Sequence, residues 1–291
     1  DNNISLTGNV NDALPYRASL GYTTQEGTLI GSTYDRATLD LSVAPSLLDK
    51  HLTLNLNGKG LYSYSNYSDG GVVGNAAFFN PTQDPYFRNA DGSIDYTTCN
   101  GFWNYGGGRG DQFTQSTLVG VSPLSQLYDK VSNGRAYRFI GNANIDYKVH
   151  GLEELKFVLS LGMDYSWGRN YNGVNPGSFQ AAGDNENPRI GQYSISNSVS
   201  RNEVLEAYAN YNKDFGIHNL DVMAGYSWQH VYNGGQSISY FNETDEVKLN
   251  PGESIDTRYP YGASESYLVS FYSRVNYSLD SRYLFTASIR A

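Results

Sequence analysis

Apolar and polar side chains alternate along roughly ten segments of the chain, and this alternation constrains the fold more than any other feature. A period of two is that of a β-strand whose two faces meet different surroundings. Residues 155–167 are the clearest case, with apolar or aromatic side chains at every odd position and Lys156, Ser160 and Asp164 at even positions. Several segments approach the ~9–11 residues with which a tilted strand crosses a bilayer. The pattern predicts an all-β fold, an antiparallel meander of about ten long strands.

Short and long connections alternate between these segments. Tight turns are expected at residues 11–13, 45–50, 151–154, 214–219 and 279–281, and long polar connections at residues 24–33, 66–133, 168–191 and 233–264. Outer-membrane barrels combine short periplasmic turns with longer extracellular loops. Tyrosines and tryptophans also gather toward the segment ends, where a barrel carries its interfacial girdles. We therefore expect a transmembrane barrel wall with an apolar face toward lipid and a polar face toward the lumen.

Composition excludes several other classes of protein. The chain has 26 tyrosines and 31 glycines but only 17% charged residues, which is typical neither of disordered chains nor of helical bundles. The net charge of −9 argues against nucleic-acid binding, because that affinity comes mostly from Lys and Arg at phosphates. Cys99 is the single cysteine, so neither an intrachain disulfide nor a thiolate zinc site is expected.

No segment carries a complete catalytic or metal-binding motif. Residues 106–110 are rich in glycine but lack the Gly-Lys-Ser/Thr of a phosphate loop, and the four histidines are scattered. Residues 89–95 place oxygen-bearing side chains around Gly92, loosely like a calcium loop, but lack the distal glutamate in register. Asp-Gly is also a common turn sequence. We expect no enzyme activity, no cofactor and no metal, and leave calcium at residues 89–95 open.

Several blocks of sequence, spread over nearly the whole chain, carry a family resemblance. They are NISLTG from Asn3, PYRASLGYTTQEG from Pro15, FNPTQDPY from Phe79, NYNK from Asn210, SFYSRVNYS from Ser270 and RYLFTASIRA from Arg282. Together these blocks resemble SusC/RagA-type TonB-linked outer-membrane proteins (TonB-dependent transporters). The family's plug, TonB box and C-terminal strands are not matched. The resemblance implies that residues 1–291 are an open, partial segment of a 22-stranded transmembrane β-barrel, roughly its first half.

The resemblance also implies a function. Members of this family import large nutrients through the cell outer membrane, typically oligosaccharides or, in some members, peptides, and alter no covalent bond of the cargo. The implied partners are a SusD-like surface lipoprotein, the TonB complex acting through the missing plug region, and outer-membrane lipid. The alternative is a soluble all-β glycan-binding or adhesin module, whose apolar face would line a core. A complete ten-stranded porin would require the first and last strands to pair.

The connection over residues 66–133 is the candidate for cargo specificity, as a long extracellular loop within the barrel. It far exceeds the ~12–15 residues beyond which a connection is usually functional or disordered. Aromatic faces suit sugar rings, while arginine and carboxylates bind hydroxyl groups. The candidate substrate-binding residues are Phe78, Phe79, Tyr86, Phe87, Phe102, Trp103, Tyr105 and Arg109. The alternative is that these aromatics form the loop's own small core and contact the lid lipoprotein.

Overall fold

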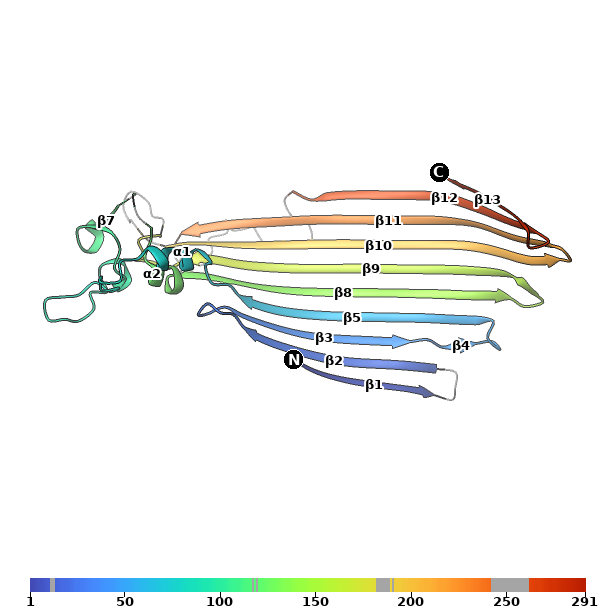
Figure 1. Ribbon diagram of the computed structural model, residues 1–291, viewed down its shortest axis with the longest axis horizontal. Helices are drawn as coiled ribbons and strands as arrows, with labels where there is room; N and C mark the ends of the chain where they lie inside the picture. Colours follow the sequence, from blue (N-terminus) through green and yellow to red (C-terminus); the bar gives the residue numbers. More distant parts are fainter. Residues whose placement is uncertain (11–13, 117, 119, 182–188, 190, 242–261) are drawn as a thin grey trace, which may run out of the picture.

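The chain forms one layer of long antiparallel strands with a compact extension at one end (Figure 1). The computed structural model describes residues 1–10, 14–116, 118, 120–181, 189, 191–241 and 262–291. The long strands are β1 (Asn2–Val10), β2 (Leu14–Glu26), β3 (Thr33–Val43), β5 (Leu52–Asn66), β8 (Lys130–Val149), β9 (Leu152–Val174), β10 (Gln192–Phe215), β11 (His218–Phe241), β12 (Ser264–Leu279) and β13 (Tyr283–Arg290). The shorter elements are β4 (Ser46–Leu47), α1 (Gly71–Phe78), η1 (Cys99–Gly101), β6 (Gly106–Gly107), η2 (Gly110–Gln112), β7 (Thr114–Gln115) and α2 (Pro123–Tyr128).

The sheet is an unclosed meander. Its order is β1-β2-β3-β5-β8-β9-β10-β11-β12-β13, with β4 paired to β5, and each long strand is antiparallel to its neighbours. The two chain termini lie at opposite edges of the sheet, and no register joins β1 to β13 among the described residues (Figure 1). The predicted open antiparallel meander is confirmed, and the described strands do not form a closed ten-stranded porin.

The apolar face is exposed across the middle of the sheet, whereas Tyr193, Ile195 and Val199 are buried on the same face at the long-loop end of β10. Directly opposite residues of an antiparallel pair share a face, so the registers trace rows of side chains across the strands, such as Leu20 opposite Leu39 and Phe139 opposite Tyr165. Phe157 is 48% exposed and Met163 is 42% exposed on this face of β9. No described strand or helix packs over residues 155–165 as a second layer. An apolar wall without a cover is the arrangement of a lipid-facing barrel, not of a soluble module with an internal core.

The opposite, polar face carries paired charges. Arg138 of β8 donates two hydrogen bonds to Asp164 of β9, at 2.9 and 2.6 Å, and Lys59 lies 3.2 Å from Asp40. Tyr272 donates to Glu206 across β12, β11 and β10 at 2.8 Å. Such groups are costly in hydrocarbon and are typical of the wall of an aqueous lumen.

From β5 onward the connections alternate in length as the sequence predicts. The connection expected to be long at residues 24–33 is only residues 27–32, shorter than residues 44–51 between β3 and β5. The prediction was wrong there because pairing of Glu26 with Thr33 continues the hairpin of β2 and β3. Between β12 and β13 the connection is the three residues 280–282, in which Asp280 and Ser281 adopt φ values of 49° and 52° and the N–H of Arg282 donates to the carbonyl of Leu279 at 3.0 Å. The turn expected at residues 11–13 lies outside the described residues. Within the described residues, no helix is both long and apolar enough to cross a membrane.

The strands beside the longest loops extend further than the sequence indicates. Residues 168–174 and 233–241, expected as loop, continue β9 and β11. The expected loops were wrong there because Gly, Asn and Ser residues stay in the ladder when a neighbouring strand supplies backbone partners, as Ser132 does opposite Asn172. The strands β8 to β11 span 20 to 24 residues, about twice what crossing a bilayer requires.

Candidate functional site

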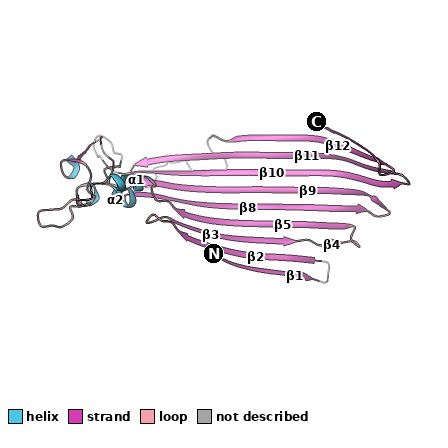
Figure 2. Cartoon of the chain, in the orientation of Figure 1, coloured by secondary structure: helices cyan, strands magenta, loops and turns pink. Residues whose placement is uncertain are grey.

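The loop of residues 66–133 folds into a compact body at the ends of the strands, and the helices found among the described residues all lie in it (Figure 2). Its centre is a small apolar cluster in which Phe87, Cys99 and Phe113 are buried, with Trp103 and Phe179 packed against it. At the N-terminus of α2, Ser122 accepts a hydrogen bond from the backbone N–H of Ser125, and Pro123 begins the first turn. The loop thus has its own core.

Most of the candidate aromatic residues form one network around this core. Trp103 contacts Tyr105 with ring centroids 4.6 Å apart, and Phe79 lies 5.9 Å from each of these rings. Phe87 also contacts Trp103, at 6.4 Å. Tyr86 and Phe102 form a second pair, in which Phe102 stacks on Tyr128 at 5.9 Å. Phe78 stands apart at the end of α1 and is 89% exposed, whereas Phe87 is 6% exposed.

Arg109 connects the aromatic network to a buried carboxylate. Its guanidinium lies 5.0 Å from the centre of the Phe87 ring and donates to Asp95 Oδ2 at 3.0 Å. Asp95 also accepts hydrogen bonds from the hydroxyls of Thr97 and Thr98, at 2.5 and 2.8 Å. The Thr97 hydrogen bond contributes most, followed by Thr98 and Arg109, to lowering the pKa of Asp95 from 3.8 to about 2. Arg109 is therefore already held by partners within the loop.

A buried polar cluster joins the loop to the segment that follows β9. Asp129, at the end of α2, accepts hydrogen bonds from Ser125 Oγ at 2.5 Å and from Asn100 at 2.9 Å. Its backbone oxygen also accepts from the N–H of Asn175 at 2.8 Å. Burial raises the pKa of the Asp129 carboxyl. These contacts fix the loop body relative to the strand ends.

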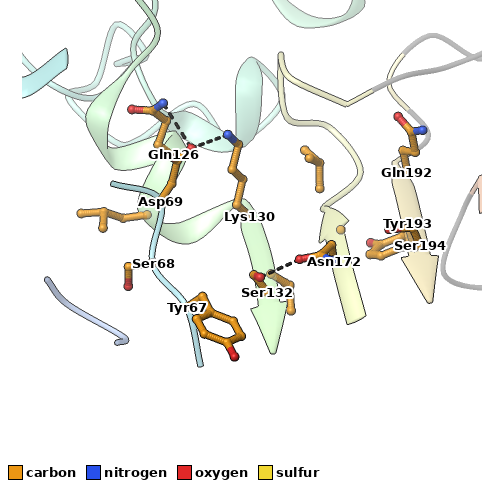
Figure 3. A pocket seen from close by; sticks show the side chains of 14 residues that line it. Tyr67, Ser68, Asp69, Gln126, Lys130, Ser132, Asn172, Gln192, Tyr193 and Ser194 are labelled. Carbon is orange, nitrogen blue, oxygen red and sulfur yellow. Dashed lines mark hydrogen bonds and ion pairs between the residues drawn. The ribbon is translucent and has the colours of Figure 1, made fainter. Parts of the chain in front are cut away.

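A cavity of about 430 Å³ lies where the loop meets the ends of β8, β9 and β10, a volume in the ~300–1,000 Å³ range of small-molecule sites. Figure 3 shows Asp69 accepting hydrogen bonds from Gln126 and Lys130 on one side of the cavity. Across the cavity, Ser132 donates to Asn172 at 2.6 Å (Figure 3). The hydrogen bond from Lys130 lowers the pKa of Asp69. The lining thus combines an ion pair, amides and hydroxyls.

The cavity opens on the polar face of the sheet. Ser132, Asn172 and Ser194 lie directly opposite one another in register. Side chains an even number of residues apart on one strand lie on the same face. Ser132 is six residues from Arg138, which is on the polar face, so Ser132 and the two residues in register with it lie on the polar face. The cavity therefore lies at the long-loop end of the wall that carries the Arg138–Asp164 pair.

The histidines and the turn at residues 89–95, where calcium was left open, have partners of their own. The rings of His51 and His150 stack with centroids 4.0 Å apart, and His230 lies between Glu203 and Glu265 at 3.0 and 2.8 Å. In the turn at residues 89–95, Asp91 accepts from the backbone and the hydroxyl of Ser93. Among the described residues, no group of three or more His, Cys, Asp or Glu side chains is arranged to hold a metal ion.

Comparison with known proteins identifies this architecture. The chain is 32% identical to the TonB-dependent receptor SusC of Bacteroides thetaiotaomicron over 302 aligned residues, covering 100% of the chain and 28% of SusC. The chain belongs to the SusC/RagA-type TonB-dependent receptors. The TonB-dependent receptor P3 of Formosa agariphila is 26% identical, over 96% of this chain and 26% of its own length. The chain thus spans about a quarter of the length of these relatives.

Solved structures agree on the fold of this receptor segment. The RagAB peptide importer in its closed-closed state matches with a TM-score of 0.63 and 16% identity, over 99% of this chain and 31% of the RagAB chain. A further structure of the RagAB peptide transporter gives the same values. At this identity the likeness concerns the fold alone. No family model matches the chain.

The cavity of the receptor segment was not anticipated from the sequence. Its walls come from residues 67–69, 126–127, 130–132, 172–174 and 192–194, which lie far apart along the chain. Lys130 and Asn172 stand in stretches expected to be at or beyond the strand ends. Asp69 carried no motif. Only the pairing register of β8, β9 and β10 could have indicated this site, because that register brings Ser132, Asn172 and Ser194 into one row.

Proposed function

We propose that the receptor containing this segment imports large nutrients, oligosaccharides or peptides, across the outer membrane with TonB and a SusD-like lipoprotein. The observation that carries the proposal is the single unclosed sheet, with one exposed apolar face and one charge-paired polar face, in a chain that aligns along its whole length with SusC. Residues 1–291 would form part of the barrel, and residues 66–133 an extracellular loop. The protein would transport its cargo without acting as an enzyme.

In this proposal the loop and the cavity beneath it contact cargo at the mouth of the lumen. The cavity offers donors and acceptors suited to hydroxyl or amide groups, and Phe78 offers an exposed ring. Phe79, Tyr86, Phe102, Trp103 and Tyr105 would present ring edges from the network, while Phe87 and Arg109 would support them.

The experiment is uptake by cells that carry the full-length receptor and its lipoprotein. Fluorescent oligosaccharide and peptide pools would be offered to cells with and without TonB. Uptake of at least one pool is expected to require TonB, and TonB-independent uptake of both pools would contradict the proposal.

A cavity-filling variant tests the loop. Asn172→Trp is expected to reduce uptake at least about tenfold, because the indole occupies the cavity between the loop and the strands. Ala90→Trp, at an exposed turn of the same loop, is the matched control and should leave uptake within about twofold, as surface changes usually do. Equal uptake by both variants would show that cargo does not pass through the cavity.

A further inference from the structure

Two arginines oppose each other directly on the apolar face of the sheet. Arg135 of β8 pairs in register with Arg169 of β9, and the next pair along the same face is Tyr137 opposite Trp167, with ring centroids 5.4 Å apart. Both arginine side chains are exposed, and the Arg135 guanidinium lies 5.7 Å from the centre of the Tyr64 ring. Like charges directly opposite each other destabilise a strand pair. The arrangement therefore costs stability unless an anion lies between the two side chains.

The described residues supply no such anion. Arg138 pairs with Asp164 on the polar face and Arg109 pairs with Asp95 in the loop, but no described carboxylate lies within ion-pair distance of Arg135 or Arg169. Arg201, on the same face of β10, has negative charge nearby, because Glu203 and Glu265 flank His230 on that face. In the described part of this face, positive charge is thus left uncompensated at the Arg135–Arg169 pair.

The depth of the pair indicates what the anion is. Tyr137 and Trp167 lie two residues from the arginines, on the side away from the loop, and aromatic side chains on a lipid-facing wall sit at the level of the headgroups. The guanidinium groups therefore extend into the headgroup layer on the long-loop side. Arginine binds phosphate through two parallel N–H donors, and two arginines together can hold one phosphate between them.

We propose that Arg135 and Arg169 bind a phosphate of an anionic glycolipid headgroup in the outer leaflet. The inference rests on the proposed function in one respect, that the apolar face meets outer-membrane lipid with the long loops outside. Phosphate oxygens accept hydrogen bonds from both guanidinium groups and offset their repulsion. The site lies on the outer wall of the barrel, on the face opposite the cavity, and so takes no part in cargo contact.

The test measures lipid retained by the full-length receptor purified in mild detergent. Lipid A, dephosphorylated lipid A or inorganic phosphate is added, and the lipid that elutes with the receptor is quantified by mass spectrometry. Arg135→Gln/Arg169→Gln is expected to retain at least about fivefold less lipid A than the unmodified receptor, because both charge-assisted donors are lost. Arg135→Lys/Arg169→Lys should fall between the two, since it keeps the charge and loses the planar fork.

The matched control is Arg17→Gln/Arg274→Gln, which removes two exposed arginines from the polar face. It should retain lipid A within about twofold of the unmodified receptor, as surface changes usually have small effects. Equal retention by the Arg135→Gln/Arg169→Gln receptor, or equal retention of dephosphorylated lipid A, would overturn the proposal. Displacement of lipid A by the same concentration of inorganic phosphate would assign the pair to a free anion and would also overturn it.

Two further readouts and one variant distinguish a folding defect, a failed lipid site and a failed proposed function. Heat-modifiable migration in gels reports whether each variant has folded. The Arg135→Lys/Arg169→Lys receptor supplies the comparison if the glutamine variant does not fold. Nutrient uptake is measured independently, so that a receptor without uptake that still retains lipid A contradicts the proposed function alone.

Discussion

Individual residues show how the loop of residues 66–133 holds a fixed shape with a core of only a few side chains. Phe87, Cys99 and Phe113 form the apolar centre, and two buried carboxylates organise the polar groups around it. Asp95 accepts hydrogen bonds from two hydroxyls and a guanidinium. Asp129, at the end of α2, accepts one from the backbone N–H of Asn175 in the segment after β9. Because buried polar groups are costly when unpaired, these carboxylates make the loop order sensitive to single substitutions.

Replacing Asp95 should loosen the loop. Asp95→Asn weakens the contacts to Arg109 and the threonines and is expected to cost about 1–3 kcal/mol of local stability. Trypsin should then cleave after Arg88 and Arg109 in the full-length receptor faster than before. Asp111→Asn, at an exposed position in the same loop, is the control. Equal cleavage of the two variants would show that Asp95 does not organise the loop.

The same carboxylate predicts an acid dependence. The pKa of Asp95 is about 2 in the folded loop against an ordinary value of 3.8. Its contribution to loop stability is therefore fully present above pH ~4 and is lost as the pH falls toward 2. In the Asp95→Asn receptor this part of the acid sensitivity should be absent.

Cys99 should be unreactive in the folded receptor. Its side chain is 1% exposed, and burial raises the pKa of its thiol to about 11, so little thiolate forms at neutral pH. N-ethylmaleimide is expected to label it only after unfolding in denaturant. Ser93→Cys, at an exposed turn in the same loop, should label at once. Prompt labelling of Cys99 in the folded protein would contradict its place in the core.

Strands are the scale at which the sequence is most informative. The alternation over residues 155–167 correctly predicts β9 and the face of each side chain, because a strand between two different surroundings must repeat every second residue. The same reasoning misses residues 168–174, where Gly168 and Asn170 suggest a loop. Pairing with β8 and β10 holds them in the sheet, and such pairing cannot be read from local composition.

Neighbouring residues of β9 should respond oppositely to the same substitution. Leu161→Arg places a charge on the exposed apolar face and is expected to cost ~2–4 kcal/mol near the bilayer centre. Ser160→Arg places it on the polar face, in register with Glu206, and should be tolerated. The amount of heat-modifiable receptor in outer membranes reports the difference. Equal assembly of both variants would argue against a lipid-facing wall.

As a whole, the molecule is a wall with two open edges and a folded body at one end. The backbone groups along the free edges of β1 and β13 have no strand partner within the described residues, and lipid supplies none. The sequence, through its alternating connections, predicts this wall and the end that carries the loop. It does not predict the cavity, because Asp69, Asn172 and Gln192 meet only after the loop docks on the strand ends.

The apolar face of this wall is expected to meet lipid and the polar face to meet water. Spin labels at single cysteines through residues 155–162 of the full-length receptor, in a cysteine-free background and in bilayers, test it directly. Collisions with dissolved oxygen should peak at Leu155, Phe157, Leu159 and Leu161, and collisions with an aqueous nickel chelate at the even positions between them. Oxygen collisions that peak at the even positions, or collision rates that do not alternate along the strand, would show that the apolar face does not meet lipid.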